Sequence, residues 1–245
     1  MFIGSEGGEA MLRQRAVQYP NVLLDVDSQV DFLTPDGHRP VRNRQIIPNI
    51  QRVFRWARHC RLTVISSIDF HRITDPVREV PQHCLAGTPG VNKLGCTLLP
   101  RRMLVQTDDT INLPHDLLTR YRQILFLKRG DDLTRNPKAD RLLTEIQASN
   151  FIILGVGLEE SVRLLALELL TRRQNVWLVA DACGYWNLQA ADLSLKQLAA
   201  KGARILTTDE LVQIQPDMRR LRRSILQRRK LRKESDRPAL GPAAN

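Results

Sequence analysis

Long apolar runs and paired cysteines are both missing from this sequence. None of its 245 residues belongs to an apolar run as long as a membrane span, and the first twenty contain no long apolar stretch. The four cysteines, at positions 60, 84, 96 and 183, show no C-x-x-C spacing. These absences disfavour a membrane protein, a disulfide framework and a four-thiolate zinc site. We therefore expect a cytoplasmic protein with reduced thiols.

Acidic residues are scarce at one end of the chain only. The formal net charge is +11. The stretch from Met218 to Arg237 contains ten lysines and arginines but only two acidic residues. Its net charge is therefore +8, which leaves a net charge of +3 for the rest of the chain. The sequence thus describes a near-neutral domain with a basic appendage, rather than a basic domain.

The basic appendage has the pattern of a helix without aromatic side chains. Asp217 can cap it, and Met218, Leu221 and Ile225 fall on one side. A solvated extension is the simpler interpretation. The sharper one is attachment to RNA, DNA or another anionic surface. Such binding would be independent of sequence and sensitive to salt, because no aromatic side chain is interleaved with the charges to stack on bases. The residues expected to contact the anion are Arg219, Arg220, Arg222, Arg223, Arg228, Arg229, Lys230, Arg232 and Lys233.

Short apolar runs of buried-strand type alternate with amphipathic helical stripes before the appendage. This alternation predicts right-handed βαβ crossovers and a three-layer α/β/α, Rossmann-like domain with a mainly parallel sheet. Thr208 is expected to cap a last helix. The expected strands are 21–26, 62–68, 123–128, 151–156, 175–180 and 203–206, and the expected helices are 45–60, 138–147 and 159–172. We divide the chain into an extension (1–19), this domain (20–215) and a basic helix and tail (216–245).

Two groups of polar residues follow the expected strands. Asp25 and Asp27 come at the end of the first one, where Asp27 is either a general acid or base or a turn cap, and Asp25 is the more ordinary of the two. Asp69 and His71 point the same way on an extended segment, and His83 follows twelve residues later. Two histidines and one carboxylate are a possible divalent metal set, although many such pairs are only hydrogen-bonded.

Lys128 and Ser161 are two further candidates. Lys128 ends the apolar run ILFLK, so it either reaches the surface or faces an anion such as Asp27 from an adjacent strand. Ser161 lies one turn into the helix expected after LGVGLEES. It is either a nucleophile or a small polar helix residue, and no G-x-S-x-G elbow or nearby histidine supports the first interpretation.

In order, these residues resemble the motifs of the isochorismatase-like cysteine hydrolases, which include nicotinamidases, pyrazinamidases, N-carbamoyl amidases and isochorismatases. The resemblance covers about residues 20–212. It rests on LLDVDSQVDF, SIDFHR, VPQHCLAGTPG, FLKRG, ILGVGLEESV and VWLVADACG, read in chain order. It implies the isochorismatase-like hydrolase fold, and the matches are closest to the nicotinamidase and pyrazinamidase branch.

The resemblance also implies roles for single residues. Asp27 and Lys128 match the catalytic aspartate and lysine, and Asp69, His71 and His83 match the ligands of a divalent metal, with zinc the expected ion. A non-proline cis peptide that aims amides at an oxyanion would fall at Val156 and Gly157. The nucleophilic cysteine falls on Ser161, and this departure leaves the chemistry open because a serine alcohol is less acidic than a thiol.

Three functions remain open at this point. The first is an atypical hydrolase that cleaves the C–N bond of a small amide, nicotinamide-like or ureido. In it either Ser161 attacks weakly or metal-activated water attacks instead. The second is a non-catalytic relative that binds or scaffolds, with its tail on nucleic acid or another anionic surface. The third is an isochorismatase-type vinyl-ether hydrolase, which would not need the metal residues. The family also implies a homo-oligomer.

Overall fold

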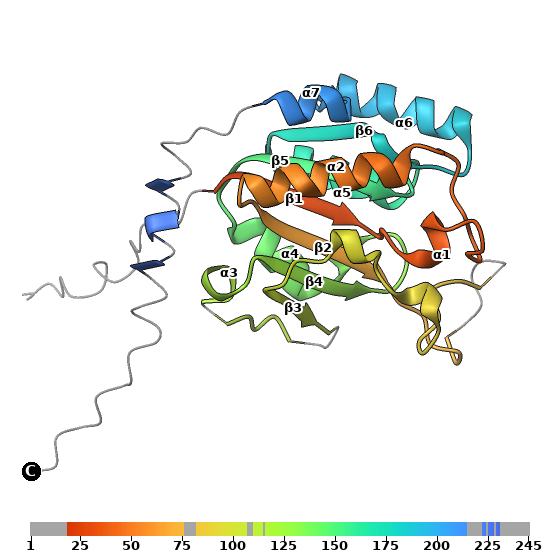
Figure 1. Cartoon of the computed structure of the whole chain (residues 1–245), viewed down its shortest axis with the longest axis horizontal. Helices are drawn as coiled ribbons and strands as arrows, with labels where there is room; N and C mark the ends of the chain where they lie inside the picture. The colour runs from red at the N-terminus through yellow and green to blue at the C-terminus, as the bar shows by residue number, and fades with distance from the viewer. Residues whose placement is uncertain are drawn as a thin grey trace, which may run out of the picture.

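A seven-stranded parallel sheet forms the centre of the molecule, in the order β3-β4-β2-β1-β5-β6-β7 (Figure 1). The computed structural model describes residues 19–75, 82–106, 110–114 and 116–214, together with 222–223, 225–227 and 229–230. The strands are β1 (Tyr19–Val26), β2 (Thr63–Asp69), β3 (Arg102–Val105), β4 (Gln123–Lys128), β5 (Ala148–Val156), β6 (Val176–Gly184) and β7 (Arg204–Leu206). Every pair of neighbouring strands is parallel.

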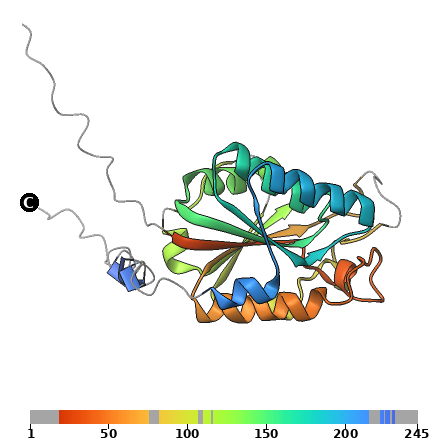
Figure 2. The ribbon, with the colours of Figure 1, turned by 90° about the horizontal axis from the view of Figure 1, so that it is seen from above.

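Helices cover both faces of this sheet. Figure 2 shows α2 (Ile46–His59) and α7 (Thr208–Gln213) on one face, and α4 (Pro137–Glu145), α5 (Ser161–Thr171) and α6 (Leu188–Ala200) on the other. The shorter helices are α1 (Val30–Leu33) and α3 (Leu117–Arg120), with 3-10 turns η1 (Pro89–Val91), η2 (Gly95–Thr97) and η3 (Leu133–Arg135). The three-layer α/β fold expected from the sequence is thereby confirmed.

Two hydrophobic cores hold the layers together, one on each face. Phe54 and Leu154 belong to the core beneath α2, while Phe126 and Val162 belong to the core beneath α5. Successive side chains of a central strand point alternately into the two cores, so both faces of the strand are apolar. For this reason the central strands appear in the sequence as continuous apolar runs. Burial of these side chains supplies most of the stabilisation.

Several elements differ from the sequence expectations. Strand β3 and helix α6 were not expected, and β6 continues to Gly184, past a register shift where it pairs with β5. The cap of α7 is Thr207, which forms a capping box with Glu210, so the expectation for Thr208 was wrong by one residue. Thr208 instead donates to Asp181 through both its amide and its hydroxyl.

The described part of the basic appendage is helical. Its residues 222–223, 225–227 and 229–230 have helical conformation, and Arg222, Arg223, Arg229 and Lys230 are exposed. The other expected anion-contacting residues lie outside the described residues: Arg219, Arg220, Arg228, Arg232 and Lys233. Among the described helices, none is long and apolar enough to cross a bilayer.

Candidate active site

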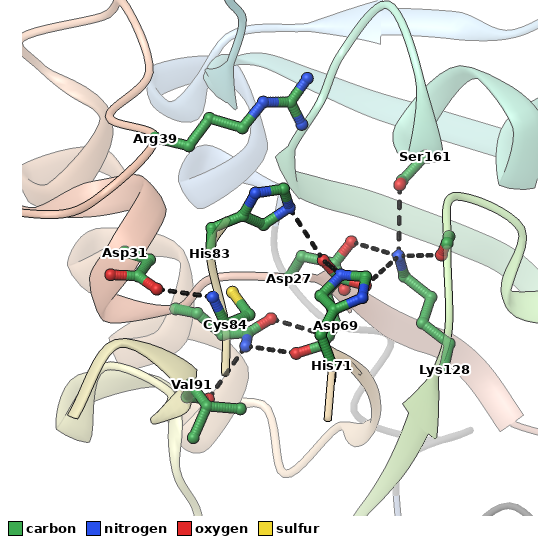
Figure 3. Close-up of polar contacts among 12 residues, drawn as sticks. Asp27, Asp31, Arg39, Asp69, His71, His83, Cys84, Val91, Lys128 and Ser161 are labelled. Carbon is green, nitrogen blue, oxygen red and sulfur yellow. Dashed lines mark hydrogen bonds and ion pairs between the residues drawn. The ribbon is translucent and has the colours of Figure 1, made fainter. Parts of the chain in front are cut away.

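The polar residues singled out in the sequence meet at the carboxyl end of the sheet. Asp27, Asp69 and Lys128 stand at the ends of β1, β2 and β4, and Ser161 begins α5 after β5. All four line one pocket, and Figure 3 shows them facing one another. Side chains from these separate strands converge because parallel strands end at a common edge.

Asp27 occupies a strained backbone position that Ser67 stabilises. Its φ is +47°, which is unusual for a residue with a side chain. Ser67 Oγ donates to Asp27 Oδ1 over 2.6 Å and accepts the Asp27 amide at 3.1 Å. Burial raises the pKa of Asp27 above its ordinary value, and the ion pair with Lys128 offsets this rise only in part. A buried carboxylate with a raised pKa is suited to accepting a proton.

Lys128 is the central cation of the pocket. Its Nζ lies 2.9 Å from Asp27 Oδ2 and 3.8 Å from Asp69 Oδ1. Burial works against its charge, but these two carboxylates raise the pKa of Lys128 above its ordinary value. β2 lies between β1 and β4, so Lys128 reaches Asp27 across a strand and not from an adjacent one. At neutral pH it is therefore a charged donor and not a base.

Ser161 is the first residue of α5, not a residue one turn into the helix. It is 6% exposed, and its Oγ accepts a hydrogen bond from Lys128 Nζ at 3.4 Å. Since this position is also the positive end of the helix dipole, negative charge developing there would be stabilised.

Asp69, His71 and His83 gather as a candidate metal site. Nε2 of His71 and Nε2 of His83 lie 2.9 and 3.3 Å from Asp69 Oδ2. One ligand atom from each residue falls within 4.8 Å of the others. Burial opposes ionisation of Asp69, yet Lys128 and the two histidines hold its pKa well below the ordinary value.

This donor set fits a divalent ion such as zinc. Two imidazole nitrogens and one carboxylate are a three-ligand set that leaves a further position open. Oδ1 of Asp69 is buried and accepts no hydrogen bond from the described residues, although Lys128 lies near it. A bound cation would compensate the negative charge of this carboxylate. It would also give the two neighbouring imidazoles a common partner.

Residues outside the expected set hold the candidate metal ligands in place. The side-chain amide of Gln29 donates to the carbonyl of Asp69 and accepts its backbone amide, both at 2.8 Å. Asp31 accepts the amide of Cys84, next to His83, at 2.6 Å. The sequence placed Gln29 and Asp31 in the first motif but gave no sign of these contacts, which join residues 40 and 53 positions apart.

A charged and aromatic wall that sequence reasoning missed closes one side of the pocket. Arg39 lies over the ring of Trp186, 3.7 Å from its centroid, and its guanidinium contacts the carboxylate of Glu160 at 3.3 and 3.4 Å. Glu160 directly precedes Ser161. These pairs span 121 and 147 residues, so no local pattern announces them.

The turn at Val156 and Gly157 is built on glycine conformations. Gly155 and Gly157 have φ values of +132° and +76°. The amides of Gly157 and Leu158 both donate to the carbonyl of Gly184, at 3.1 and 2.9 Å. The Gly157 amide therefore has a partner in the protein, and so do the amides of Glu160 and Val162, which both donate to the carbonyl of Gly157.

The remaining candidates have structural roles. Asp25 is buried and pairs with Lys93 at 2.8 Å, in keeping with the ordinary role favoured for it. Cys84 and Cys183 are buried, and burial raises the pKa of each thiol. Neither cysteine can therefore supply the nucleophilic thiolate that is missing at position 161.

Comparison with known proteins places the chain in a family. The profile of the isochorismatase domain matches residues 21–210, so the chain belongs to the isochorismatase family of hydrolases. A comparison with curated proteins found no match.

Solved structures share the fold at low identity. A pyrazinamidase of Pyrococcus horikoshii in complex with zinc is 22% identical with a TM-score of 0.59, over 77% of this chain and 99% of that one. An isochorismatase-like hydrolase from Alkaliphilus metalliredigens is 21% identical with a TM-score of 0.62, over 79% and 97%. A nicotinamidase/pyrazinamidase from Bacillus subtilis is 18% identical with a TM-score of 0.62, over 76% and 98%.

Proposed function

We propose that this protein hydrolyses the C–N bond of a small amide, nicotinamide-like or ureido, in the pocket of Asp27, Lys128 and Ser161. The observation that carries the proposal is the buried Asp27–Lys128 ion pair, which contacts Ser161 beside the three candidate metal ligands. The structural similarity to nicotinamidases and pyrazinamidases supports the choice of substrate class.

Each side chain has a distinct role in this reaction. Asp27 accepts a proton, as its raised pKa favours. Lys128 keeps Asp27 in place and donates hydrogen bonds to the oxygen on which charge develops. Asp69, His71 and His83 would hold zinc, which when bound supplies a Lewis acid. Ser161 lies where the resembling enzymes have their nucleophile, and as an alcohol it would react more slowly than a thiolate.

A non-catalytic binding protein is the competing function, and one observation favours it. Within the described part of the chain, the hydrogen-bond partner of Ser161 Oγ is the ammonium of Lys128. An ammonium group has no lone pair, so it cannot take the serine proton. In this case the pocket would bind its ligand without cleaving it. The vinyl-ether hydrolase is third, because it has no use for the clustered metal ligands.

The partners follow from the same alternatives. A small-molecule ligand fits the pocket under both of the first two functions. We further propose a homo-oligomer, as the resemblance implies, and contact of the basic tail with an anionic partner. The described tail residues Arg222, Arg223, Arg229 and Lys230 are exposed and available for such contact.

Replacing Ser161 with alanine separates the hydrolase from the binding protein. The wild-type protein and Ser161→Ala are assayed on nicotinamide, small amides and ureido acids, with metal analysis of both. If the protein is a hydrolase, the wild type should turn over a substrate, and the rate should fall by about tenfold or more in Ser161→Ala. A group in contact with the reacting atoms accelerates the reaction by at least that factor. Equal activity of the two proteins would exclude Ser161 as the nucleophile. Absence of both turnover and bound metal in the wild type would end the amidase proposal.

A further inference from the structure

The edge of the sheet opposite the pocket is strongly basic. The segments that enter the strands at this amino edge are 58–62, 99–102, 116–122, 145–147, 171–175 and 200–204. They contain ten lysines and arginines but only two acids, Asp116 and Glu145. The basic residues are Arg58, Arg61, Arg101, Arg102, Arg120, Arg122, Arg172, Arg173, Lys201 and Arg204. Their positions were not expected from the sequence, because they come from five separate connections.

Most of these charges are open to solvent. Eight of the ten residues are exposed, all but Arg122 and Arg172. Arg120 pairs with Asp116, and Arg172 pairs with Asp140 and Glu168. For Arg61, Arg101 and Arg173, no ion pair lies within the described part of the chain. Basic residues at the C-terminal ends of helices complement the helix dipole. This explains the ones next to α2, α3, α5 and α6, but not Arg101 and Arg102.

The last described residue before the basic tail lies at the same edge. The last residue described before it, Ile214, accepts a hydrogen bond at 3.3 Å from the indole of Trp56, which lies in the last turn of α2. Two residues further along α2 is Arg58, the first residue of the amino edge. Figure 1 shows the arrowheads of the strands on the opposite side of the domain from the end of α7. The domain therefore adds its own positive charge to that of the tail.

We propose that this amino edge binds double-stranded nucleic acid through its phosphates. Nine of its ten basic residues are arginine, whose planar guanidinium matches phosphate geometry. Seven strands at a spacing of about 4.8 Å give the edge a width of about 29 Å. A duplex of that length carries about 17 phosphate charges. These phosphates outnumber the ten basic residues of the edge, so each of those residues can meet a phosphate.

The other macromolecular partners fit less well. A protein partner needs buried apolar anchors, and none of the exposed large hydrophobic residues in the described chain lies in these six segments. A single strand needs exposed aromatic platforms, whereas the rings of Tyr121 and Trp177 at this edge are only partly exposed. Recognition is therefore by charge alone and independent of sequence.

The salt dependence of binding tests this surface in the full-length protein. Binding of a 24-base-pair duplex is followed by fluorescence anisotropy at increasing salt concentrations for the wild type and for Arg61→Gln/Arg101→Gln/Arg173→Gln. Three lost phosphate contacts should reduce the slope of log K against log salt by about 2.7. The charge-preserving Arg61→Lys/Arg101→Lys/Arg173→Lys should keep the wild-type slope, which separates lost charge from lost folding.

Matched variants show whether the change in salt dependence comes from the amino edge. Arg44→Gln/Arg135→Gln/Lys196→Gln removes the same charge from exposed positions outside the amino edge and should leave the slope unchanged. Substituting glutamine at Arg222, Arg223, Arg229 and Lys230 should lower the slope further when combined with the edge variant. The proposal is overturned if the wild type does not bind the duplex, if edge and control variants lose binding equally, or if phosphatidylserine vesicles bind at this edge while the duplex does not.

Discussion

The chemistry of single residues in the pocket depends on how buried opposite charges compensate one another. Lys128 and Asp27 have side chains only 2% and 4% exposed, and Asp69 lies close by. Removing one partner of a buried ion pair leaves the other uncompensated, and this is far more destabilising than losing a surface pair. Lys128 should therefore matter for the stability of the protein as well as for its chemistry.

We predict that Lys128→Met lowers the free energy of unfolding of the metal-free protein by about 3–5 kcal/mol, because two carboxylates lose their shared cation. The measurement is urea unfolding at neutral pH in the presence of a chelator. Arg135→Met is the control, since its ion pair with Asp132 is largely exposed and should contribute less than about 1 kcal/mol. Equal losses in the two variants would show that Lys128 does not compensate the carboxylates.

Single residues also mark the limit of what the sequence could predict about the site. Short sequence motifs predict six residues of the site, and the structure brings them together in one pocket: Asp27, Asp69, His71, His83, Lys128 and Ser161. Arg39, Glu160 and Trp186 were missed, since their contacts join distant segments. The supporting bonds of Gln29 and Asp31 were missed for the same reason.

At the scale of elements, the pairing of β1 with β5 sets the positions of the residues that follow these two strands in the pocket. Val26 pairs with Gly155 just before Asp27 and the turn to Ser161. A Cβ on Gly155 would lie 1.9 Å from the carbonyl oxygen of Val26, and the φ of Gly155 is itself unfavourable for other residues. Asp27 and Ser161 therefore keep their separation only if residue 155 has no side chain.

We predict that Gly155→Ala lowers the melting temperature and also weakens ligand binding or turnover in the pocket, because β1 and β5 must move apart. Thermal unfolding and activity report the two effects. Gly95→Ala serves as the control, since a Cβ there meets nothing within 4 Å and the backbone is unstrained. A Gly155→Ala protein as stable and active as the control would contradict the close approach.

Elements were predictable where their apolar pattern is strong. The run QILFLK was expected as a strand over 123–128 and is β4 with the same bounds. The short edge strand β3, Arg102–Val105, has two exposed residues and a weak pattern, so it was not expected. Helix α6 was missed although it is long; it buries only Ala191, Ser194 and Leu198, which are weak markers of a helix face.

The whole molecule has two chemically different ends. The carboxyl edge of the sheet holds the buried carboxylates and the candidate metal site, whereas the amino edge holds a large excess of arginine. The sequence predicted the three-layer architecture, since strand and helix patterns alternate along the chain. It could not predict the basic edge, because its basic residues are scattered over five connections that only the parallel sheet brings together.

The exchange of Ser161 for cysteine is the most direct test of the central claim, that this pocket is a hydrolase site with an alcohol in the nucleophile position. The measurement is kcat/KM on the small-amide panel for Ser161→Cys and the wild type, both with zinc. The account predicts a gain of about tenfold or more for the cysteine variant, because a thiol is the more acidic nucleophile and Lys128 stabilises its anion. A zinc-loaded, folded Ser161→Cys protein with no gain on any amide would contradict it.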